Sequence, residues 1–478
     1  MRTSHRDAHV WTGFCRRSAH LDGRRQAFSG PEYGGLVTTD ERLSLPKLVA
    51  TTREVPPLDD PLLHASAGDP LAWIRRGDGI VGAGPELLRL DIGEDSRLEA
   101  LTDIWHAIVQ ATDVDDEVQL PGTGLVAFGA FAFDEASDAP STLIVPSTVI
   151  GRRGGRHWIT RITRAEGADV PDVDEVGYGP QWSATLGPGR MDPAAHSDAV
   201  RDVLGRIADG EAEKVVIARD ISGTVPAGAD LRRLVSELAH GYPDTWTFAV
   251  DGLIGASPET LVTVSGGTVT ARVLAGTIPR GADADEDTAL SVELAKSDKN
   301  VEEHAFAIAS VLEALRPYTA TLEASETPSL LRLPNLWHLA TDVTGTLSNG
   351  ASALNLVRAL HPTAAVGGTP RDVAMRIIRD VEPFDRGRYA GPVGWIDGNG
   401  DGEWAIALRC AQFGGAGDTT STGDDEGDDP AAADWSRGAN ATRRVTAHAG
   451  GGIVSGSVPE SELDETRVKF RPIVDALA

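Results

Sequence analysis

The stretch Glu213-Lys-Val-Val-Ile-Ala-Arg-Asp220 follows a segment with helical spacing, and its β-branched run predicts a buried strand with a lysine at its mouth. Lys214 is one of only five lysines in a chain that otherwise takes its positive charge from arginine. Arginine does not give up its proton, whereas a partly desolvated lysine can do so and act as a base. A solvent-exposed lysine at a strand edge is the alternative, and residue 214 alone does not decide between the two.

Length and composition indicate a globular protein. A chain of 478 residues with 41% hydrophobic residues can form one large continuous α/β core. No run approaches the ~18 apolar residues of a membrane span, and the Arg-rich N-terminus lacks the apolar stretch of a secretory signal. We therefore expect a cytoplasmic protein without a membrane partner. Cys15 and Cys410 are too few for a disulfide framework or a thiolate metal site.

The net charge is strongly negative. A formal charge of -27 and a pI near 4.8 argue against nucleic acid or an anionic membrane surface as a partner, because both would be repelled. An anionic small substrate would need local cations inside its pocket.

The pattern along the chain predicts three parts and one insertion. Residues 1–40 lack periodicity, and we expect a poorly ordered extension. Residues 41–190 alternate short apolar runs with a helix near 97–112, which indicates a scaffold without a chemical motif. Residues 191–478 carry the sharper signals. Within them, 414–441 is rich in Gly and Asp and is expected to be a disordered surface insertion.

Apolar periodicity predicts the elements of the catalytic part. The expected helices are 198–208, 297–315, 353–360, 370–380 and one that opens near Pro459. The expected strands are 215–218, 247–250, 261–264, 269–274 and a hairpin of 389–397 with 403–413.

Several short stretches, weak when taken singly, occur together in order. They are Lys214-Val-Val, Ser257-Pro-Glu259, Ala275-Gly-Thr277, Ser297-Asp-Lys-Asn-Val-Glu-Glu-His304, Leu336-Trp-His-Leu-Ala-Thr341, His361-Pro-Thr363, Glu382-Pro-Phe-Asp-Arg386, Gly402-Glu-Trp404 with Arg409, and Glu465-Thr466 with Lys469. On these motifs the chain, from about residue 195 to its end, resembles the chorismate-utilising enzymes, and most closely the isochorismate synthases. The departures are Ala364 in place of a common Pro, Gly451 in place of the usual Ala, and the acidic insertion.

The resemblance implies a fold and a reaction. The fold would be a single large α/β (α+β) domain of two packed antiparallel-rich β-sheets flanked by helices, with the site in a cleft between them. The reaction would convert chorismate to isochorismate: water adds at ring carbon 2 while the hydroxyl at carbon 4 leaves. The product would serve menaquinone or siderophore biosynthesis.

The resemblance also implies the catalytic pair. Water needs a base on one ring face, and a hydroxide leaving group needs an acid on the other. Lys214 would be the base and Glu259 the acid. The lysine must then be neutral and the glutamate protonated, so burial should lower one pKa and raise the other.

Binding roles follow from the same resemblance. Mg²⁺, held by Glu303 and Glu465, would anchor the ring carboxylate of the dianionic substrate, since hard oxygen ligands suit that ion. Arg409 suits bidentate binding of a carboxylate. The substrate-binding candidates are Gly276, Thr277, His338, Ala340, Tyr389, Arg409, Gly450 and Lys469.

Other members of the family remain as alternatives. Amine-installing relatives usually carry Gln at the position of Lys214, and the aminodeoxychorismate branch uses a lysine where this chain has Ala275. Salicylate synthases share Lys214 and Glu259 and go on to eliminate pyruvate, but Leu339-Ala-Thr341 is more similar to the synthases that stop at isochorismate. A non-catalytic chorismate-binding relative would not need acid, base and metal carboxylates together. We expect a monomer or a weak homodimer.

The insertion generates a first prediction. Because 414–441 has no residue with an assigned role, deleting it should leave the conversion of chorismate unchanged. Turnover by the deletion variant, measured on protein whose circular dichroism shows that it has folded, tests this. A folded variant without turnover would refute it.

Overall fold

The computed structural model describes residues 45–93, 96–166, 172–332, 336–414, 419–420 and 441–478. All of them belong to one compact unit, Leu36–Ala478. The expected N-terminal extension, residues 1–40, lies outside the described residues, as does most of the expected insertion. Of the insertion, Thr419–Thr420 form a short strand paired with Thr442 and Arg443.

Strands make up most of the fold. They are β1 (Leu48–Val55), β2 (Leu71–Arg75), β3 (Asp78–Ile92), β4 (Asp113–Asp116), β5 (Val126–Ala130), β6 (Ser141–Arg153), β7 (Arg156–Arg164), β8 (Leu186–Pro188), β9 (Lys214–Pro226), β10 (Trp246–Val250), β11 (Leu253–Ser257), β12 (Thr260–Ser265), β13 (Thr268–Pro279), β14 (Thr319–Ala324), β15 (Ser329–Arg332), β16 (Leu336–Leu347), β17 (Gly368–Thr369), β18 (Pro392–Asp397), β19 (Gly402–Ile406), β20 (Cys410–Phe413), β21 (Thr419–Thr420) and β22 (Thr442–Val454). The helices are α1 (Arg97–Ala111), α2 (Pro193–Ala208), α3 (Arg232–Gly241), α4 (Ala284–Lys296), α5 (Asp298–Leu315), α6 (Ala353–Leu360), α7 (Arg371–Val381) and α8 (Pro459–Leu477), with 3-10 turns η1 (Pro61–His64) and η2 (Arg316–Tyr318).

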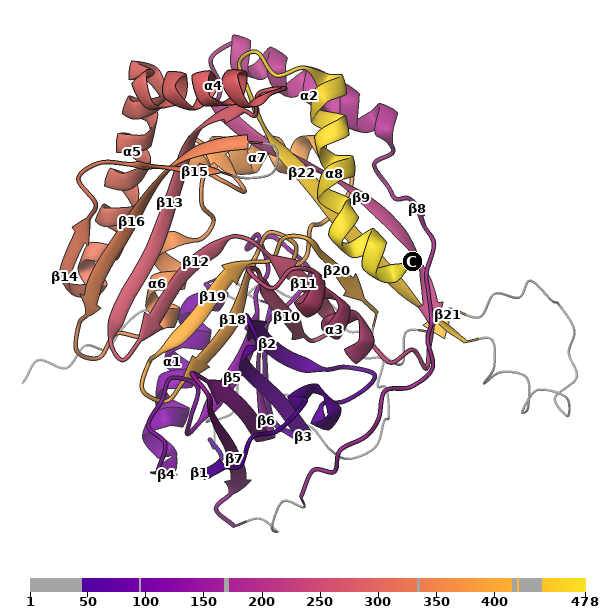
Figure 1. Ribbon diagram of the computed structural model, residues 1–478, viewed down its shortest axis with the longest axis vertical. Helices are drawn as coiled ribbons and strands as arrows, with labels where there is room; N and C mark the ends of the chain where they lie inside the picture. The colour runs from indigo at the N-terminus through magenta and orange to yellow at the C-terminus, as the bar shows by residue number, and fades with distance from the viewer. Residues whose placement is uncertain (1–44, 94–95, 167–171, 333–335, 415–418, 421–440) are drawn as a thin grey trace, which may run out of the picture. The chain divides into compact units, whose positions relative to one another are not determined.

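Two strand ladders diverge from the long strand β6. One runs β6–β3–β2–β10–β11–β20–β22–β9, and the other runs β6–β5–β18–β19–β12–β13–β16. All of these pairings are antiparallel, whereas β1 and β4 pair in parallel. In Figure 1 the far end of the first ladder is covered by α2 and α8, and that of the second by α4 and α5. The predicted antiparallel-rich architecture flanked by helices is confirmed, but the described strands are hydrogen-bonded into one continuous sheet with two branches rather than into two separate sheets, because β6 pairs with both β3 and β5.

Local sequence explains where the helices begin. Asp192 caps α2 by accepting a hydrogen bond from the Ala195 N–H at 2.8 Å, and Pro193 occupies the first turn, where a missing N–H costs nothing. Ser297 caps α5 in the same way. Each cap satisfies N–H groups that the helix itself leaves unpaired.

Most expected elements of the catalytic part are present, but the strands β11, β14, β15, β16, β17, β21 and β22 were not predicted. The helices α3 and α4 were not predicted either, because each carries only a short apolar stripe. The segment 403–413 is two strands rather than one, since Arg409 adopts a left-handed φ of +50° between β19 and β20. As a result, β19 pairs with β18 while β20 pairs with β11 and β22.

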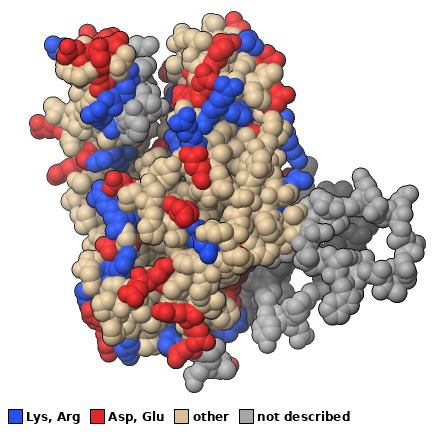
Figure 2. Space-filling view, turned by 45° about the vertical axis from the view of Figure 1, so that its right-hand side comes forward, with Lys and Arg blue, Asp and Glu red and all other residues tan. Residues whose placement is uncertain are grey.

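Charge and hollows are visible on the surface. Figure 2 shows acidic and basic side chains interspersed over one face, and a hollow between the part that holds α4 and α5 and the part that holds α2 and α8. Among the described helices, none is both long and apolar enough to cross a bilayer.

A buried ion pair is hydrogen-bonded to the backbone of β9. Nη2 of Arg386 lies 2.5 Å from Oε1 of Glu382, and the two side chains are 2% and 1% exposed. Glu382 also accepts a hydrogen bond from the Ala218 N–H at 2.8 Å, and Arg386 donates to the Val216 carbonyl at 2.8 Å. The motif that contains Glu382 and Arg386 therefore fixes the strand that begins with Lys214.

This pair generates a stability prediction. Arg386→Met should lower the free energy of unfolding by about 3–5 kcal/mol, because it leaves the Glu382 carboxylate buried without its counter-charge. Urea denaturation measures the change. The matched control is Arg272→Met, since the Arg272–Asp342 pair is half exposed on both sides and should cost about 0–1 kcal/mol. Equal losses in the two variants would contradict the prediction.

Candidate active site

Lys214 is the first residue of β9 and lies where three strands meet. It pairs across the ladder with Val454 of β22 and with Thr369 of β17. Its side chain crosses Gly452, where an added Cβ would lie 2.7 Å from Cε of the lysine. Gly452 therefore leaves the space in which the Lys214 side chain lies.

Glu259 lies in the short connection between β11 and β12, and its backbone is fixed from both sides. Its N–H donates to Oγ of Ser257 at 3.2 Å, and its carbonyl accepts from the Ile406 N–H at 3.0 Å. Ser257 is itself held by donating to the Ile406 carbonyl at 2.6 Å. The predicted Ser257-Pro-Glu259 motif thus aims one carboxyl group from a rigid turn.

The electrostatic environment of Glu259 favours its neutral form. Burial raises the pKa of the Glu259 carboxyl above its ordinary value, and this outweighs the opposing positive charges of Lys214, Lys469 and Arg409. This direction agrees with the protonated state that an acid on a leaving hydroxyl requires. A neutral Lys214 would withdraw one of the opposing charges and favour the protonated carboxyl further.

Helix α8 brings a second group of charges to the same place. Nζ of Lys469 lies 2.5 Å from Oε1 of Glu465 and donates to the Gly450 carbonyl at 2.7 Å. An added Cβ at Gly451 would lie 2.9 Å from Oε2 of Glu462 and 3.7 Å from Oε1 of Glu465. The departure from Ala at position 451 therefore leaves room for the Glu462 carboxylate against the strand.

Adjacent strand positions face opposite ways, which fixes the relation of these groups to β22. Gly451 faces Glu462 and Glu465 of α8, whereas Gly452 faces Lys214. The glycine run therefore leaves room beside β22 both for the Glu462 carboxylate and for the Lys214 side chain.

The β13–β16 ladder supplies another wall of the site. Thr277 pairs with His338, and Ala340 is buried opposite Leu274. Gly276 has a φ of +75° at the irregularity between Ala275 and Thr277, a conformation that favours glycine. The Thr277 side chain lies outside the described part of the chain.

His338 is neutral near pH 7. Burial lowers the pKa of its imidazole below the ordinary value, and the charges of Lys214 and Lys469 lower it further, against a hydrogen bond to the Gly276 backbone and the charge of Glu465. A neutral imidazole can donate or accept a hydrogen bond without adding charge.

Arg409 and Tyr389 approach from a third side. Burial lowers the pKa of the Arg409 guanidinium, while Tyr389, Glu465 and Glu259 raise it. These three groups therefore lie close enough to Arg409 to interact with it electrostatically. Tyr389 is buried, and its ring stacks on His448 with centroids 5.1 Å apart. Burial raises the pKa of the Tyr389 hydroxyl, which keeps it a hydrogen-bond donor.

The structure thus assembles most of the predicted residues around one centre. The members whose charges or contacts link them are Lys214, Glu259, Gly276, His338, Tyr389, Arg409, Gly450, Glu465 and Lys469. For Glu303 only the backbone position in α5 is described. Within the described part of the chain, no three His, Cys, Asp or Glu side chains cluster as a metal site, so a metal there would depend on residues such as Glu303.

Three residues near the site had no predicted role. Glu462 shares a face of α8 with Glu465, and burial raises the pKa of its carboxyl, helped by the charge of Glu465. His304 donates from Nδ1 to the Ala275 carbonyl at 3.1 Å, and its Nε2 lies 2.8 Å from Oγ1 of Thr341. His448 stacks on Tyr389. The spacing of Glu462 from Glu465 was a usable signal, whereas the position of His448 depends on strand register.

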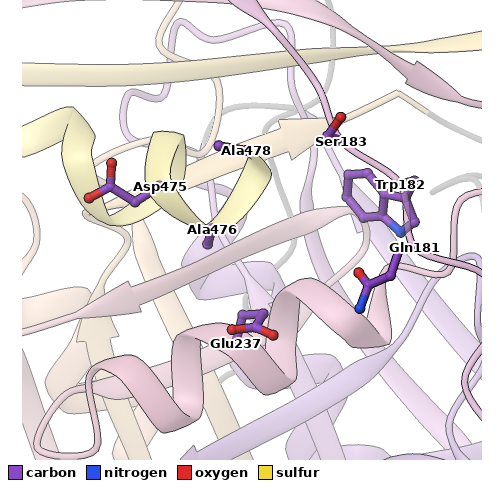
Figure 3. A pocket seen from close by; sticks show the side chains of 7 residues that line it. All are labelled: Gln181, Trp182, Ser183, Glu237, Asp475, Ala476 and Ala478. Carbon is purple, nitrogen blue, oxygen red and sulfur yellow. The ribbon is translucent and has the colours of Figure 1, made fainter.

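Two hollows lie away from this centre. Figure 3 shows one of about 390 Å³, where side chains from α3, α8 and the segment before β8 meet; it is lined by Gln181, Trp182, Ser183, Glu237, Asp475, Ala476 and Ala478. The other, of about 340 Å³, is lined by His64, Ala65, Ser66, Gly84, Pro85, Asp172, Val173, Asp174 and Val176. Neither contains a predicted site residue.

Comparison with known proteins defines the class. Residues 179–419 and 437–478, more than half of the chain, match the model of the family described as chorismate binding enzyme. The chain belongs to this family, and the predicted membership is confirmed. Within the family, the relatives similar to this chain include isochorismate synthases.

Two relatives and two solved structures illustrate the similarity. Isochorismate synthase DhbC of Bacillus subtilis is 39% identical over 60% of this chain and 68% of its own. The putative isochorismate synthase MenF of Mycobacterium tuberculosis is 37% identical over 74% of this chain and 87% of its own. The structure of a putative 2,3-dihydroxybenzoate-specific isochorismate synthase, DhbC from Bacillus anthracis, covers 87% of this chain and 98% of its own at 31% identity and a TM-score of 0.63. The menaquinone-specific isochorismate synthase MenF from Escherichia coli covers 91% of this chain and 95% of its own, with a TM-score of 0.67 at 23% identity, and shows the shared fold.

The raised pKa of Glu259 generates a prediction that needs no substrate. A carboxyl whose folded pKa lies above its unfolded value of about 4.5 costs stability as pH rises through that interval. Glu259→Gln removes this cost, so the variant should melt at a higher temperature than the wild type at pH 7 and at the same temperature near pH 4. Thermal melts across pH measure the difference.

The control for this experiment is Glu326→Gln, because Glu326 is exposed and its substitution should leave the melting temperature unchanged at both pH values. If Glu259→Gln melts no higher than the wild type at pH 7, the raised pKa is wrong.

Proposed function

We propose that the protein is an isochorismate synthase that converts chorismate to isochorismate. The observation that carries the proposal is that Lys214 lies close enough to the buried Glu259 for its charge to act on a carboxyl whose burial favours protonation, with Lys469 and Arg409 also close by. The identity of 37–39% to isochorismate synthases over long alignments supports the same reaction.

The chain's own residues account for the proton movements. Neutral Lys214 takes a proton from the water that attacks ring carbon 2, and protonated Glu259 gives a proton to the hydroxyl that leaves carbon 4. The two ring double bonds shift as the new bond to oxygen forms at carbon 2 and the bond to the hydroxyl at carbon 4 breaks. One water molecule is therefore taken up and one is released. Afterwards the lysine is charged and the glutamate ionised, and one proton must return from the lysine to the glutamate, directly or through solvent, before the next cycle.

Substrate binding follows from charge. The protein carries a formal charge of -27, so a dianion needs local cations, and Arg409 and Lys469 lie close enough to Glu259 to act on its pKa. Arg409 can hold one carboxylate with two parallel hydrogen bonds. His338 and the Tyr389 hydroxyl add neutral donors, Gly276, Ala340 and Gly450 lie on the strands beside them, and the Thr277 backbone pairs with His338.

Mg²⁺ fits the donor set of α8. Glu462 and Glu465 lie together against Gly451, and burial raises the pKa of the Glu462 carboxyl, helped by the charge of Glu465, while Lys469 pairs with Glu465. Glu465, with Glu303 and with Glu462 beside it, would hold the ion through hard oxygen ligands. When bound, the ion would neutralise and orient the ring carboxylate of the substrate.

The proposal extends to the setting of the enzyme. A cytoplasmic enzyme that acts as a monomer or weak homodimer, without nucleic acid or membrane as partner, agrees with its acidic composition. MenF relatives and siderophore-related relatives, such as the vibriobactin-specific isochorismate synthase of Vibrio cholerae, are both similar to this chain, so the product would feed menaquinone or siderophore synthesis.

The test is product analysis by chromatography after incubation of purified protein with chorismate and Mg²⁺. The wild type should form isochorismate, and EDTA should stop the reaction until Mg²⁺ is restored. Lys214→Ala and Glu259→Gln should each lower kcat by about 10²–10⁴-fold, because each removes one proton-transfer group.

Lys47→Ala is the matched control, since Lys47 forms only an exposed ion pair with Asp113 in the described structure and should keep full activity. Salicylate accumulating with pyruvate would instead identify a salicylate synthase. Unchanged turnover in both catalytic-site variants would place the chemistry elsewhere.

A further inference from the structure

Arg219 is a buried cation between β9 and α8. Its side chain is 5% exposed, and among the described residues no carboxylate forms an ion pair with it. Burial lowers the pKa of its guanidinium, and the charge of Arg467 lowers it further, against the opposing charge of Asp220. A hydrophobic side chain would fill this space at lower cost.

Its guanidinium contacts one face of α8. Nε of Arg219 donates to Oγ1 of Thr466 at 2.7 Å, and its guanidinium carbon lies 4.8 Å from the centre of the Phe470 ring. Thr466 is completely buried and donates in turn to the Leu463 carbonyl at 2.7 Å. Arg219 therefore contacts α8 at Thr466 and at Phe470, which lie about one helical turn apart.

These positions directly follow the two site residues of the helix. Thr466 comes after Glu465, and Phe470 comes after Lys469. Successive helix residues are about 100° apart around the axis. The face that contacts Arg219 therefore lies beside the face that carries Glu462, Glu465 and Lys469. A small rotation of α8 would move those side chains away from Gly450 and Gly451, where they now lie.

We propose that Arg219 is a positioning residue, which through Thr466 sets the rotation of α8 and so holds Glu465 and Lys469 at the site. The proposal rests on the proposed function, because it assigns those two side chains to metal and substrate. Arg219 lies on the same strand as Lys214, so this contact fixes the helix relative to the proposed base.

The experiment compares two substitutions of Thr466. Thr466→Val removes the acceptor of the Arg219 hydrogen bond and keeps the shape, whereas Thr466→Ser keeps the hydroxyl. Isothermal titration calorimetry with Mg²⁺ alone should give a dissociation constant about tenfold higher for Thr466→Val and one close to the wild type for Thr466→Ser. In turnover, KM for chorismate should rise more than kcat falls in Thr466→Val.

Arg219→Met and a matched control complete the design. Arg443→Met also removes a buried arginine, which stacks on Phe413 and donates to the Gly68 and Gly414 carbonyls away from the site. Both variants should melt at lower temperature, but only Arg219→Met should weaken Mg²⁺ binding. The double variant with Thr466→Val should bind Mg²⁺ no more weakly than Arg219→Met alone, because both remove the same hydrogen bond.

The outcomes separate this proposal from the proposed function. If Thr466→Val and Arg219→Met bind Mg²⁺ as the wild type does, or if the wild type binds none, the positioning role is overturned. If the wild type binds Mg²⁺ and Thr466→Val weakens it, but no isochorismate forms, the positioning role stands and the proposed reaction fails.

Discussion

The pairing of β9 with β22 is the interaction on which the site depends. It aligns Lys214 with Val454 and places three glycines, Gly450 to Gly452, opposite the first half of β9. A side chain at Gly450 would collide with the Ile217 carbonyl. One at Gly451 would collide with Glu462, and one at Gly452 with Lys214. Without the glycine run, neither the lysine nor the carboxylates of α8 would have room beside β22.

The site also depends on a balance of charge. Burial favours neutral Glu259 and neutral His338, while Lys214, Lys469 and Arg409 favour the ionised carboxylate. In a protein with so many acidic residues, these cations are concentrated where a dianion would bind, and Glu465 partly neutralises them through Lys469. A bound anion would balance the positive charges of Lys214, Lys469 and Arg409, and a divalent cation would balance the negative charges of the carboxylates.

Local pattern predicted much of this structure. Helical periodicity identified α5 and α8, and the β-branched run at 215–218 identified β9, because short-range spacing sets both. The motifs carried by resemblance identified the residues that converge on the centre. The sequence could not show that Glu382 and Arg386 support β9, that Arg219 contacts Thr466, or that Arg409 breaks a strand, since these facts depend on register and on partners far along the chain.

The order of the strands has a consequence for folding. β9 emerges from the ribosome well before β22, and only β22 covers its edge along most of its length. Until that partner is made, a long apolar strand has unpaired backbone groups and can associate with other chains. Contacts between such distant segments also form slowly, so this edge of β9 stays open to association with other chains until β22 has been made.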